Sequence, residues 1–166
     1  TPVAGTARLR EAAAHHFRRD LGIATEAERV IVCNGGKQAI FNALLATISA
    51  GEEVIVPVPW WVSYPQIVRF AGGKAVPLIT HARDNFRFDA ADFEALITPS
   101  TRWMLLNSPG NPTGAVYPAA MLQAIGAVLR RHIADIDAGM PYDAALERLG
   151  QRLGIDEGKD LAATIS

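Results

Sequence analysis

Hydrophobic residues along the chain follow two patterns in turn, a helical repeat and short unbroken apolar runs. A helix over about 6–21, ending at Gly22, is predicted by a four-residue repeat of Leu9, Ala13, Phe17 and Leu21. The same reasoning predicts strands over 30–33, 54–56, 75–80 and 102–106, and helices over 40–48, 62–71, 90–97 and 121–129. The second strand is expected to be broken by Pro57 and Pro59. The pattern is thus one helix followed by four strand–helix pairs.

The predicted strands are uniformly apolar, which is typical of strands that helices cover on both faces. Right-handed crossovers between successive strands then give an α/β fold with a three-layer, mostly parallel sheet. In such sheets, ligands bind just beyond the carboxyl ends of the strands. Three polar or aromatic clusters follow predicted strands at such positions: Asn34–Lys37, Pro59–Trp61 and Asn107–Gly114.

The first cluster contains Gly35, Gly36 and Lys37, between a predicted strand and a predicted helix. Glycine lets a ligand approach the backbone, and the free N–H groups and dipole of a helix N-terminus favour an anion such as phosphate. A tight strand-to-helix turn without a ligand explains the same residues equally well. The spacing differs from that of a P-loop and from that of the dinucleotide-binding fingerprint.

The other two clusters carry aromatic and amide side chains. An indole of Trp60 or Trp61 is suited to lie flat against an aromatic cofactor ring, although core or subunit-contact roles are more common for tryptophan. The sequence NSPGNPTG at 107–114 has two prolines, which fix φ and restrict the residue before each. Such a turn holds Asn111 so that its amide donates to a phenolate or carboxylate oxygen, but Asn-Pro turns also occur without ligands.

Composition and charge narrow the possible partners. The chain has 166 residues, of which 49% are hydrophobic and 20% charged, enough for one domain with a sizeable core. Its net charge of −1 gives no electrostatic basis for binding nucleic acid or an anionic membrane. The single cysteine, Cys33, and the lack of a membrane-spanning run or signal-peptide pattern predict a cytoplasmic protein. No metal site is predicted, because the adjacent His15 and His16 point in different directions on a helix.

The three clusters, in this order and spacing, resemble the fold-type I pyridoxal-phosphate enzymes, the class I/II aminotransferases, and most closely their aspartate-aminotransferase-like branch. The resemblance rests on TPVAGTARLREAAAHHFRRDLG, on VIVCNGGKQAIFNALLATISAGEEVIVPVPWWVSYPQIVRFAGGKAVPL and on LNSPGNPTGAVY. It covers residues 1–132, which it identifies as a partial cofactor-binding large domain. It implies transfer of an amino group between an amino acid and a 2-oxo acid, in an enzyme that is usually a homodimer.

The resemblance also implies roles for individual residues toward pyridoxal 5'-phosphate. Gly35, Gly36 and Lys37 would bind the phosphate of the cofactor. Trp61 would stack on the pyridine ring, and Asn111 would hydrogen-bond the 3-oxygen of the ring. Trp61 and Asn111 would also contact the substrate, with Asn111 near the substrate carboxylate.

The match to this family stops near residue 132. Beyond that point the family supplies an aspartate for the pyridinium nitrogen, a tyrosine, a Schiff-base lysine and an arginine for the substrate carboxylate, and none of them is identifiable here. The chain has three lysines: Lys37 at the phosphate end, Lys74 at the start of a predicted strand and Lys159 in the tail. With no identifiable catalytic residue, we expect this chain alone to be inactive as an aminotransferase.

Residues 133–166 are predicted to form a helical tail, with helical spacing at Ala145, Leu149 and Leu153. The segment AGMPYDAALERLGQRLGI is faintly similar to helical segments of the type II secretion F/Tad family. The alternative to an aminotransferase fragment is a non-catalytic α/β or interaction module, in which the C-terminal helices cover the open sheet.

Overall fold

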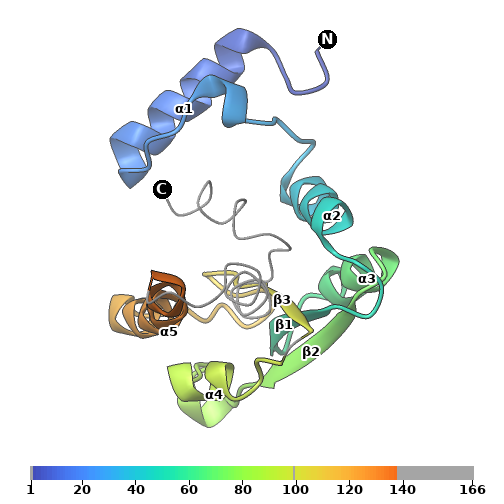
Figure 1. The fold of residues 1–166 in the computed structure, drawn as a ribbon, viewed down its shortest axis with the longest axis vertical. Coiled ribbons are helices and arrows are strands. Elements are labelled where there is room, and N and C mark those ends of the chain that lie inside the picture. The colour runs from blue at the N-terminus through green and yellow to red at the C-terminus, as the bar shows by residue number, and fades with distance from the viewer. Residues whose placement is uncertain (1, 99, 138–166) are drawn as a thin grey trace. The chain divides into compact units, whose positions relative to one another are not determined.

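The structure is a computed structural model and describes residues 2–98 and 100–137. The chain divides into two compact units between Asn42 and Ala43, within helix α2, and each unit is described by itself. The elements, in chain order (Figure 1), are α1 (Ala7–Leu21), a 3-10 helix (Ala27–Arg29), α2 (Gly36–Thr47), β1 (Glu53–Val58), α3 (Ser63–Phe70), β2 (Lys74–Ile79), a 3-10 helix (Ala82–Asp84), α4 (Ala90–Glu94), β3 (Thr101–Met104) and α5 (Ala119–Asp137). Among the described helices, none is long and apolar enough to cross a membrane.

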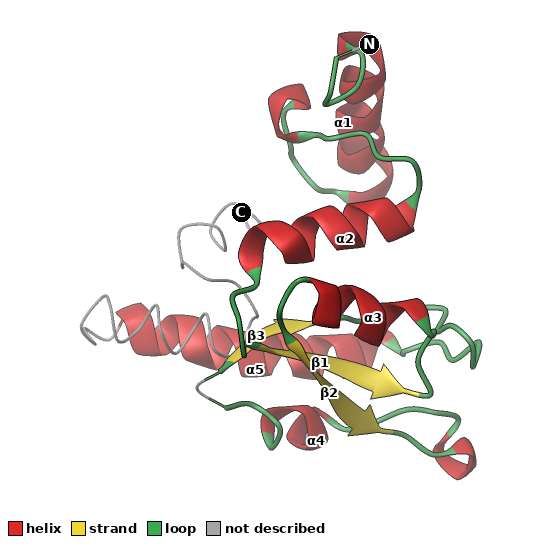
Figure 2. Ribbon diagram, turned by 90° about the vertical axis from the view of Figure 1, so that its right-hand side faces the viewer, coloured by secondary structure: helices red, strands yellow, loops and turns green. Residues whose placement is uncertain are grey.

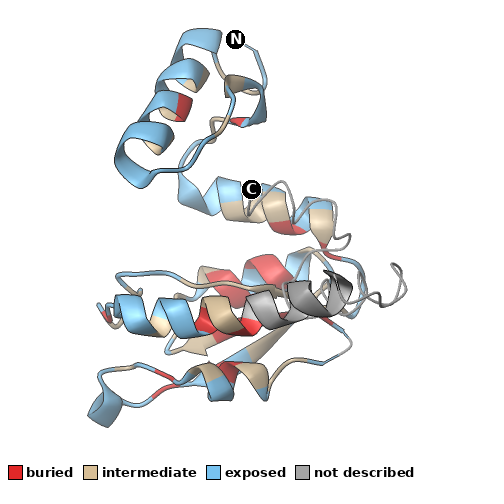
Figure 3. Cartoon of the chain, turned by 60° about the vertical axis from the view of Figure 1, so that its left-hand side comes forward, coloured by how far each residue is buried: buried red, intermediate tan, exposed pale blue. Residues whose placement is uncertain are grey.

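Helix α1 has the boundaries that its sequence predicts. Its N-terminus is capped by the Thr6 side chain, which accepts a hydrogen bond from the Leu9 N–H. Its C-terminus is closed by Gly22, whose φ of 69° is left-handed, as is common for a helix-ending glycine. The predicted stop at Gly22 is therefore confirmed. Much of the helix surface is exposed (Figure 3), and its buried residue is Ala14.

The predicted strand at 30–33 is wrong. Residues Val30–Cys33 belong to no strand in the described part of the chain. Their backbone groups bond within their own unit instead: the Val32 N–H donates to the Ala4 carbonyl at 3.0 Å, and the Val30 carbonyl accepts from Arg10 Nε at 2.9 Å. A strand requires a neighbouring strand to complete its ladder, and an apolar, β-branched run does not supply one. The cluster at 34–37 consequently follows a loop.

The second unit contains a parallel sheet with strand order β2-β1-β3. Glu53 of β1 pairs with Lys74 of β2 and with Thr101 of β3, so all three strands start at one edge and run in the same direction. This confirms the predicted α/β fold with a parallel sheet. Helix α3 covers one face, and α4 and α5 cover the other (Figure 2).

Two prolines lie within the strands, and the prediction that Pro57 breaks β1 is wrong. The Ile55 carbonyl accepts a hydrogen bond from the Leu105 N–H, so the backbone polar groups of Ile55 point toward β3. Pro57 lies two residues further along β1, so its backbone points to the same side. The described β1–β3 pairing ends at Ile55, so the missing N–H of Pro57 removes no ladder bond. In β2, the Lys74 and Thr80 N–H groups donate toward β1. Pro77 therefore faces away from β1, on the outer side.

The two faces of the sheet are packed by different helices. On the α4/α5 face, the core consists of buried residues Ile55, Leu78, Phe88, Phe93, Tyr117, Ile125 and Val128. On the other face, α3 buries Tyr64, Pro65, Ile67 and Val68. Each fully buried aliphatic or aromatic side chain contributes about 1.5–3 kcal/mol. Helix α5 continues without a break past residue 132, and the predicted tail helix at 145–153 lies outside the described residues.

Candidate functional site

A hollow lies at the carboxyl edge of β1 and β3. It is small and open to solvent, with a cavity volume of about 20 Å³. Because the two strands are parallel neighbours, the segments that follow them, which start at Pro59 and Leu105, leave the sheet at the same edge. The polar and aromatic residues that line the hollow are Trp60, Tyr64, Asn107, Asn111, Thr113 and Tyr117. Two of the three predicted clusters are thus brought to one site.

The turn at 107–114 is held by its own hydrogen bonds. The Gly110 N–H donates to the Ala115 carbonyl at 2.7 Å, and the Gly114 N–H donates to the Gly110 carbonyl at 2.7 Å. The Thr113 hydroxyl accepts from the Ala115 N–H at 3.2 Å. Asn111 lies inside this closed loop and is exposed at the hollow. The turn therefore presents the Asn111 amide on a backbone that is already fixed.

The two tryptophans have different surroundings. Trp60 lines the hollow. Trp61 packs edge-to-face on Tyr64, with ring centroids 5.6 Å apart and planes at 87°. Trp61, the predicted stacking residue, is therefore adjacent to a residue of the lining, while Trp60 belongs to the lining itself.

The hollow is uncharged among the described residues that line it. Burial raises the pKa of the Tyr117 phenol above its ordinary value, so this hydroxyl stays protonated at neutral pH. Hydroxyl and amide groups of this kind donate hydrogen bonds to oxygen acceptors. The lining is suited to a planar aromatic ligand that carries an acceptor oxygen.

Gly35, Gly36 and Lys37 lie in the first unit, at the start of α2. The Gly35 carbonyl accepts from the Gln38 and Ala39 N–H groups, which begins the helix. Gly35 has a φ of +98°, a conformation that glycine adopts without strain. A Cβ atom built on Gly35 or Gly36 meets nothing within 4 Å, so the backbone here is open to a ligand. The first N–H groups of a helix have no partner within the helix, and they favour an anion.

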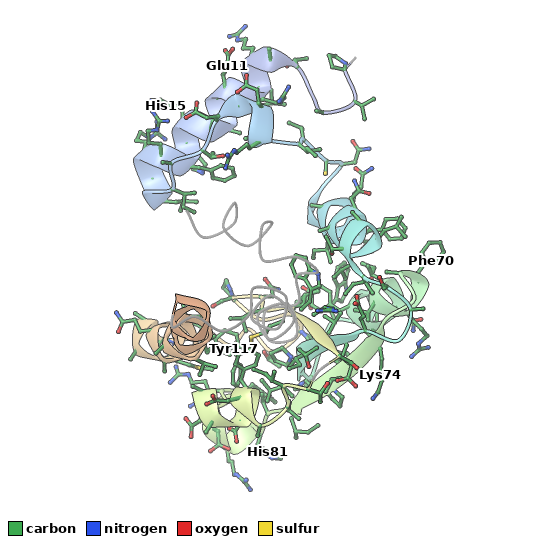
Figure 4. The ribbon with its side chains drawn as sticks, in the orientation of Figure 1. Glu11, His15, Phe70, Lys74, His81 and Tyr117 are labelled. Atoms are coloured by element: carbon green, nitrogen blue, oxygen red, sulfur yellow. The ribbon has the colours of Figure 1, made fainter. Side chains whose placement is uncertain are left out.

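Two ion pairs occupy the opposite, amino edge of the sheet. Lys74 is labelled in Figure 4. Its Nζ atom lies 2.8 Å from Glu53 Oε1, and the Thr98 hydroxyl donates to Glu53 Oε2 at 2.7 Å. Arg102 Nε lies 2.6 Å from Glu52 Oε1, and both side chains are largely buried. These contacts tie β1 to β2 and β3. Lys74 is consequently engaged far from the edge that carries the hollow.

Sequence reasoning missed Tyr64, Asn107, Thr113 and Tyr117 as residues of the site. Asn107 and Thr113 belong to the turn at 107–114, and their position in that turn was the signal that could have identified them. Tyr64 lies three residues after Trp61, and this closeness in the sequence was the available signal. Tyr117 gave no signal, because an aromatic residue just before a helix is usually a core residue.

A helix-covered parallel sheet with a polar and aromatic hollow at its carboxyl edge defines an open-sheet α/β protein, a class in which ligands bind at that edge. The comparison with protein families is more specific. The model of aminotransferase class I and II matches residues 1–135, and the chain belongs to that family.

Individual relatives agree with this assignment. The chain is 46% identical over 132 residues to a probable aspartate/prephenate aminotransferase of Rhizobium leguminosarum bv. phaseoli, which covers 80% of this chain and 33% of the relative. An aspartate aminotransferase of Rhizobium meliloti is 41% identical over 150 residues, 87% of this chain and 37% of the relative. The solved Thermus thermophilus aspartate aminotransferase with maleate superposes with a TM-score of 0.76 at 47% identity, over 80% of this chain and 35% of that one. The chain thus spans about a third of the length of these relatives.

Proposed function

We propose that this chain is part of an aspartate-aminotransferase-like enzyme that transfers an amino group between an amino acid and a 2-oxo acid. The observation that supports this most directly is the hollow at the carboxyl edge of β1 and β3, which Trp60 and Asn111 both line. The names of the relatives, aspartate and aspartate/prephenate aminotransferases, support an amino acid as the substrate. A homodimer in the cytoplasm is part of the same proposal.

Enzymes of this family use pyridoxal 5'-phosphate, and the described residues fit its chemistry. The start of α2 offers a glycine backbone with open space around it, at a helix N-terminus, to a phosphate. The hollow offers an uncharged, aromatic lining with amide and hydroxyl donors to a phenolic pyridine ring. When bound, the cofactor accepts the electron pair that develops at the α-carbon of the amino acid.

Each predicted residue has a defined task in this proposal. The backbone at Gly35, Gly36 and Lys37 binds the phosphate. Trp61 covers one face of the ring and excludes water from it. Asn111 donates an amide N–H to the 3-oxygen of the ring and orients the substrate carboxylate.

The 166-residue chain by itself is proposed to bind the cofactor without catalysing amino-group transfer. Of its three lysines, Lys74 is paired with Glu53 at the amino edge and Lys37 lies in the first turn of α2. Lys159 lies outside the described residues. A lysine that binds the cofactor covalently is therefore not available at the described part of the hollow.

Titration with pyridoxal phosphate tests the proposal. The expected result is saturable quenching of tryptophan fluorescence that inorganic phosphate competes away, since Trp60 and Trp61 lie at or beside the hollow. No borohydride-fixed adduct is expected on the chain, and no half-transamination of aspartate. Absence of saturable binding would reject the aminotransferase proposal and favour a non-catalytic α/β module.

A further inference from the structure

Tyr64 connects the hollow to the predicted stacking residue. It lies in the first turn of α3, lines the hollow and is 6% exposed. Its ring meets the Trp61 ring edge-to-face. Tyr64 thus forms a buried wall of the hollow and fixes one side of Trp61.

The hydroxyl of Tyr64 lacks a hydrogen-bond partner within residues 2–98 and 100–137. The backbone N–H of Tyr64 donates to the Trp61 carbonyl at 2.9 Å, whereas no described side chain or carbonyl bonds to the phenolic oxygen. Buried polar groups nearly always have a partner, and buried tyrosine hydroxyls usually find one. The hollow is lined by uncharged residues, and the buried Tyr64 hydroxyl on its wall has no partner among the described residues. This combination points to a ligand that supplies the missing acceptor.

Tyr117 also lines the hollow but has a different setting. Its ring packs against Phe88, with centroids 5.5 Å apart, inside the core beneath the sheet. Packing in the core accounts for the ring of Tyr117. The ring of Tyr64 instead contacts Trp61, so a ligand that lies against Trp61 comes within reach of Tyr64.

We propose that Tyr64 is a ligand-binding residue whose hydroxyl donates a hydrogen bond to an acceptor atom of an aromatic, oxygen-bearing ligand in the hollow. This rests on the proposed function, in which that ligand is pyridoxal phosphate. Tyr64 then adds a hydroxyl donor to the amide donor of Asn111 and, through its ring, sets the orientation of Trp61.

Tyr64→Phe is the variant that isolates the hydroxyl, because it retains the ring that contacts Trp61. We expect the Kd for pyridoxal phosphate to rise about 5- to 10-fold, as for the loss of one hydrogen bond. The Kd for inorganic phosphate, which lacks the ring, stays unchanged. Ser63→Ala is the matched control: it removes a hydroxyl from the preceding residue of α3, which does not line the hollow, and leaves both Kd values unchanged.

The outcomes separate this inference from the proposed function. If the unmodified chain binds pyridoxal phosphate and Tyr64→Phe binds it equally well, the role of Tyr64 is overturned and the proposed function stands. A large fall in the urea midpoint of Tyr64→Phe, with the Kd values unchanged, shows that the hydroxyl has a structural partner and also overturns the role. If the unmodified chain fails to bind pyridoxal phosphate, the proposed function and the role of Tyr64 fail together.

Discussion

A Cβ atom on Gly110 would lie 2.9 Å from the Oγ1 atom of Thr113, closer than van der Waals contact allows. The same Oγ1 accepts the Ala115 N–H, so Thr113 is tied to the backbone that it supports. The closed loop between these residues carries Asn111 at the hollow. Glycine at position 110 is therefore a geometric requirement of the turn.

Gly110→Ala tests this requirement. The added methyl displaces Thr113, and we expect a loss of about 1–2 kcal/mol in the free energy of unfolding, measured by urea denaturation. The affinity for pyridoxal phosphate falls as well, because Asn111 moves with the turn. The double variant Gly110→Ala/Thr113→Ala recovers part of both losses. Wild-type stability in the single variant would show that the turn relaxes without cost.

Gly36→Ala gives the opposite pattern. A Cβ atom at Gly36 meets nothing within 4 Å, and Gly36 begins α2, so stability stays the same or rises by up to about 1 kcal/mol. The methyl occupies space that is open to a ligand, so binding of pyridoxal phosphate and of inorganic phosphate both weaken. Unchanged affinity for both ligands would remove Gly36 from the predicted phosphate site.

Asn111→Ala removes the predicted amide donor. Asn111 is exposed, so folding stability should change by less than about 0.5 kcal/mol. The Kd for pyridoxal phosphate should rise about 5- to 10-fold by fluorescence titration. Gln123→Ala, which deletes an exposed amide on α5, serves as the control and leaves the Kd unchanged. Equal Kd values for the two variants would contradict the role of Asn111.

The Glu53–Lys74 pair makes the stability of the fold depend on pH in the acid range. Burial alone pushes the pKa of Glu53 upward, but hydrogen bonds from Lys74 and Thr98, with the charge of Lys74, hold that pKa below its ordinary value. A carboxyl with a lowered pKa stabilises the fold above its unfolded pKa, and this contribution is lost as the pH falls through the folded pKa. Lys74→Met should therefore move acid unfolding to higher pH, followed by circular dichroism.

Lys74→Arg is the matched control for that shift. It retains a positive charge near Glu53 and should leave the acid midpoint close to that of the unmodified chain. Lys74 is largely exposed, so the cost of Lys74→Met at neutral pH is small, about 1 kcal/mol or less. Identical acid midpoints for Lys74→Met and Lys74→Arg would show that the charge of Lys74 has no part in the effect.

The buried pair Glu52–Arg102 carries more of the stability. The side chains are 13% and 17% exposed, and the Ser49 N–H also donates to Glu52 at 2.7 Å. Arg102→Met leaves the Glu52 carboxylate buried without its ion partner, and we expect a loss of about 3 kcal/mol in urea denaturation. Arg83→Met, which breaks an exposed pair with Asp84, should cost less than about 0.5 kcal/mol. Equal losses in the two variants would contradict the importance of burial.

The sequence predicted local elements well and lateral pairing poorly. Helix α1 and its end at Gly22, as well as the existence of β1, β2 and β3, follow from periodicity and from residues with special φ values. The prediction of a strand at 30–33 was wrong, because the pairing of a strand depends on a neighbouring strand far away in the sequence. Pro57 was misjudged for the same reason, since its effect depends on the side of the strand that carries a partner.

The candidate site shows the same division. The turn at 107–114 and the segment at 59–61 were recognised from composition, and the parallel pairing of β1 with β3 brings them to one hollow. That Trp60 rather than Trp61 lines the hollow depends on side-chain directions that the sequence does not contain. The Tyr64 hydroxyl has no partner among residues 2–98 and 100–137, and this becomes visible only when those residues are placed.

Pro77 lies on the outer side of β2, where a fourth strand from another molecule would have to attach. At that position such a strand finds no N–H to bond. This discourages sheet-to-sheet self-association, which is the usual hazard of an exposed strand. The outer edge of β2 thus disfavours the addition of another strand, because the proline ring of Pro77 leaves no N–H at that position.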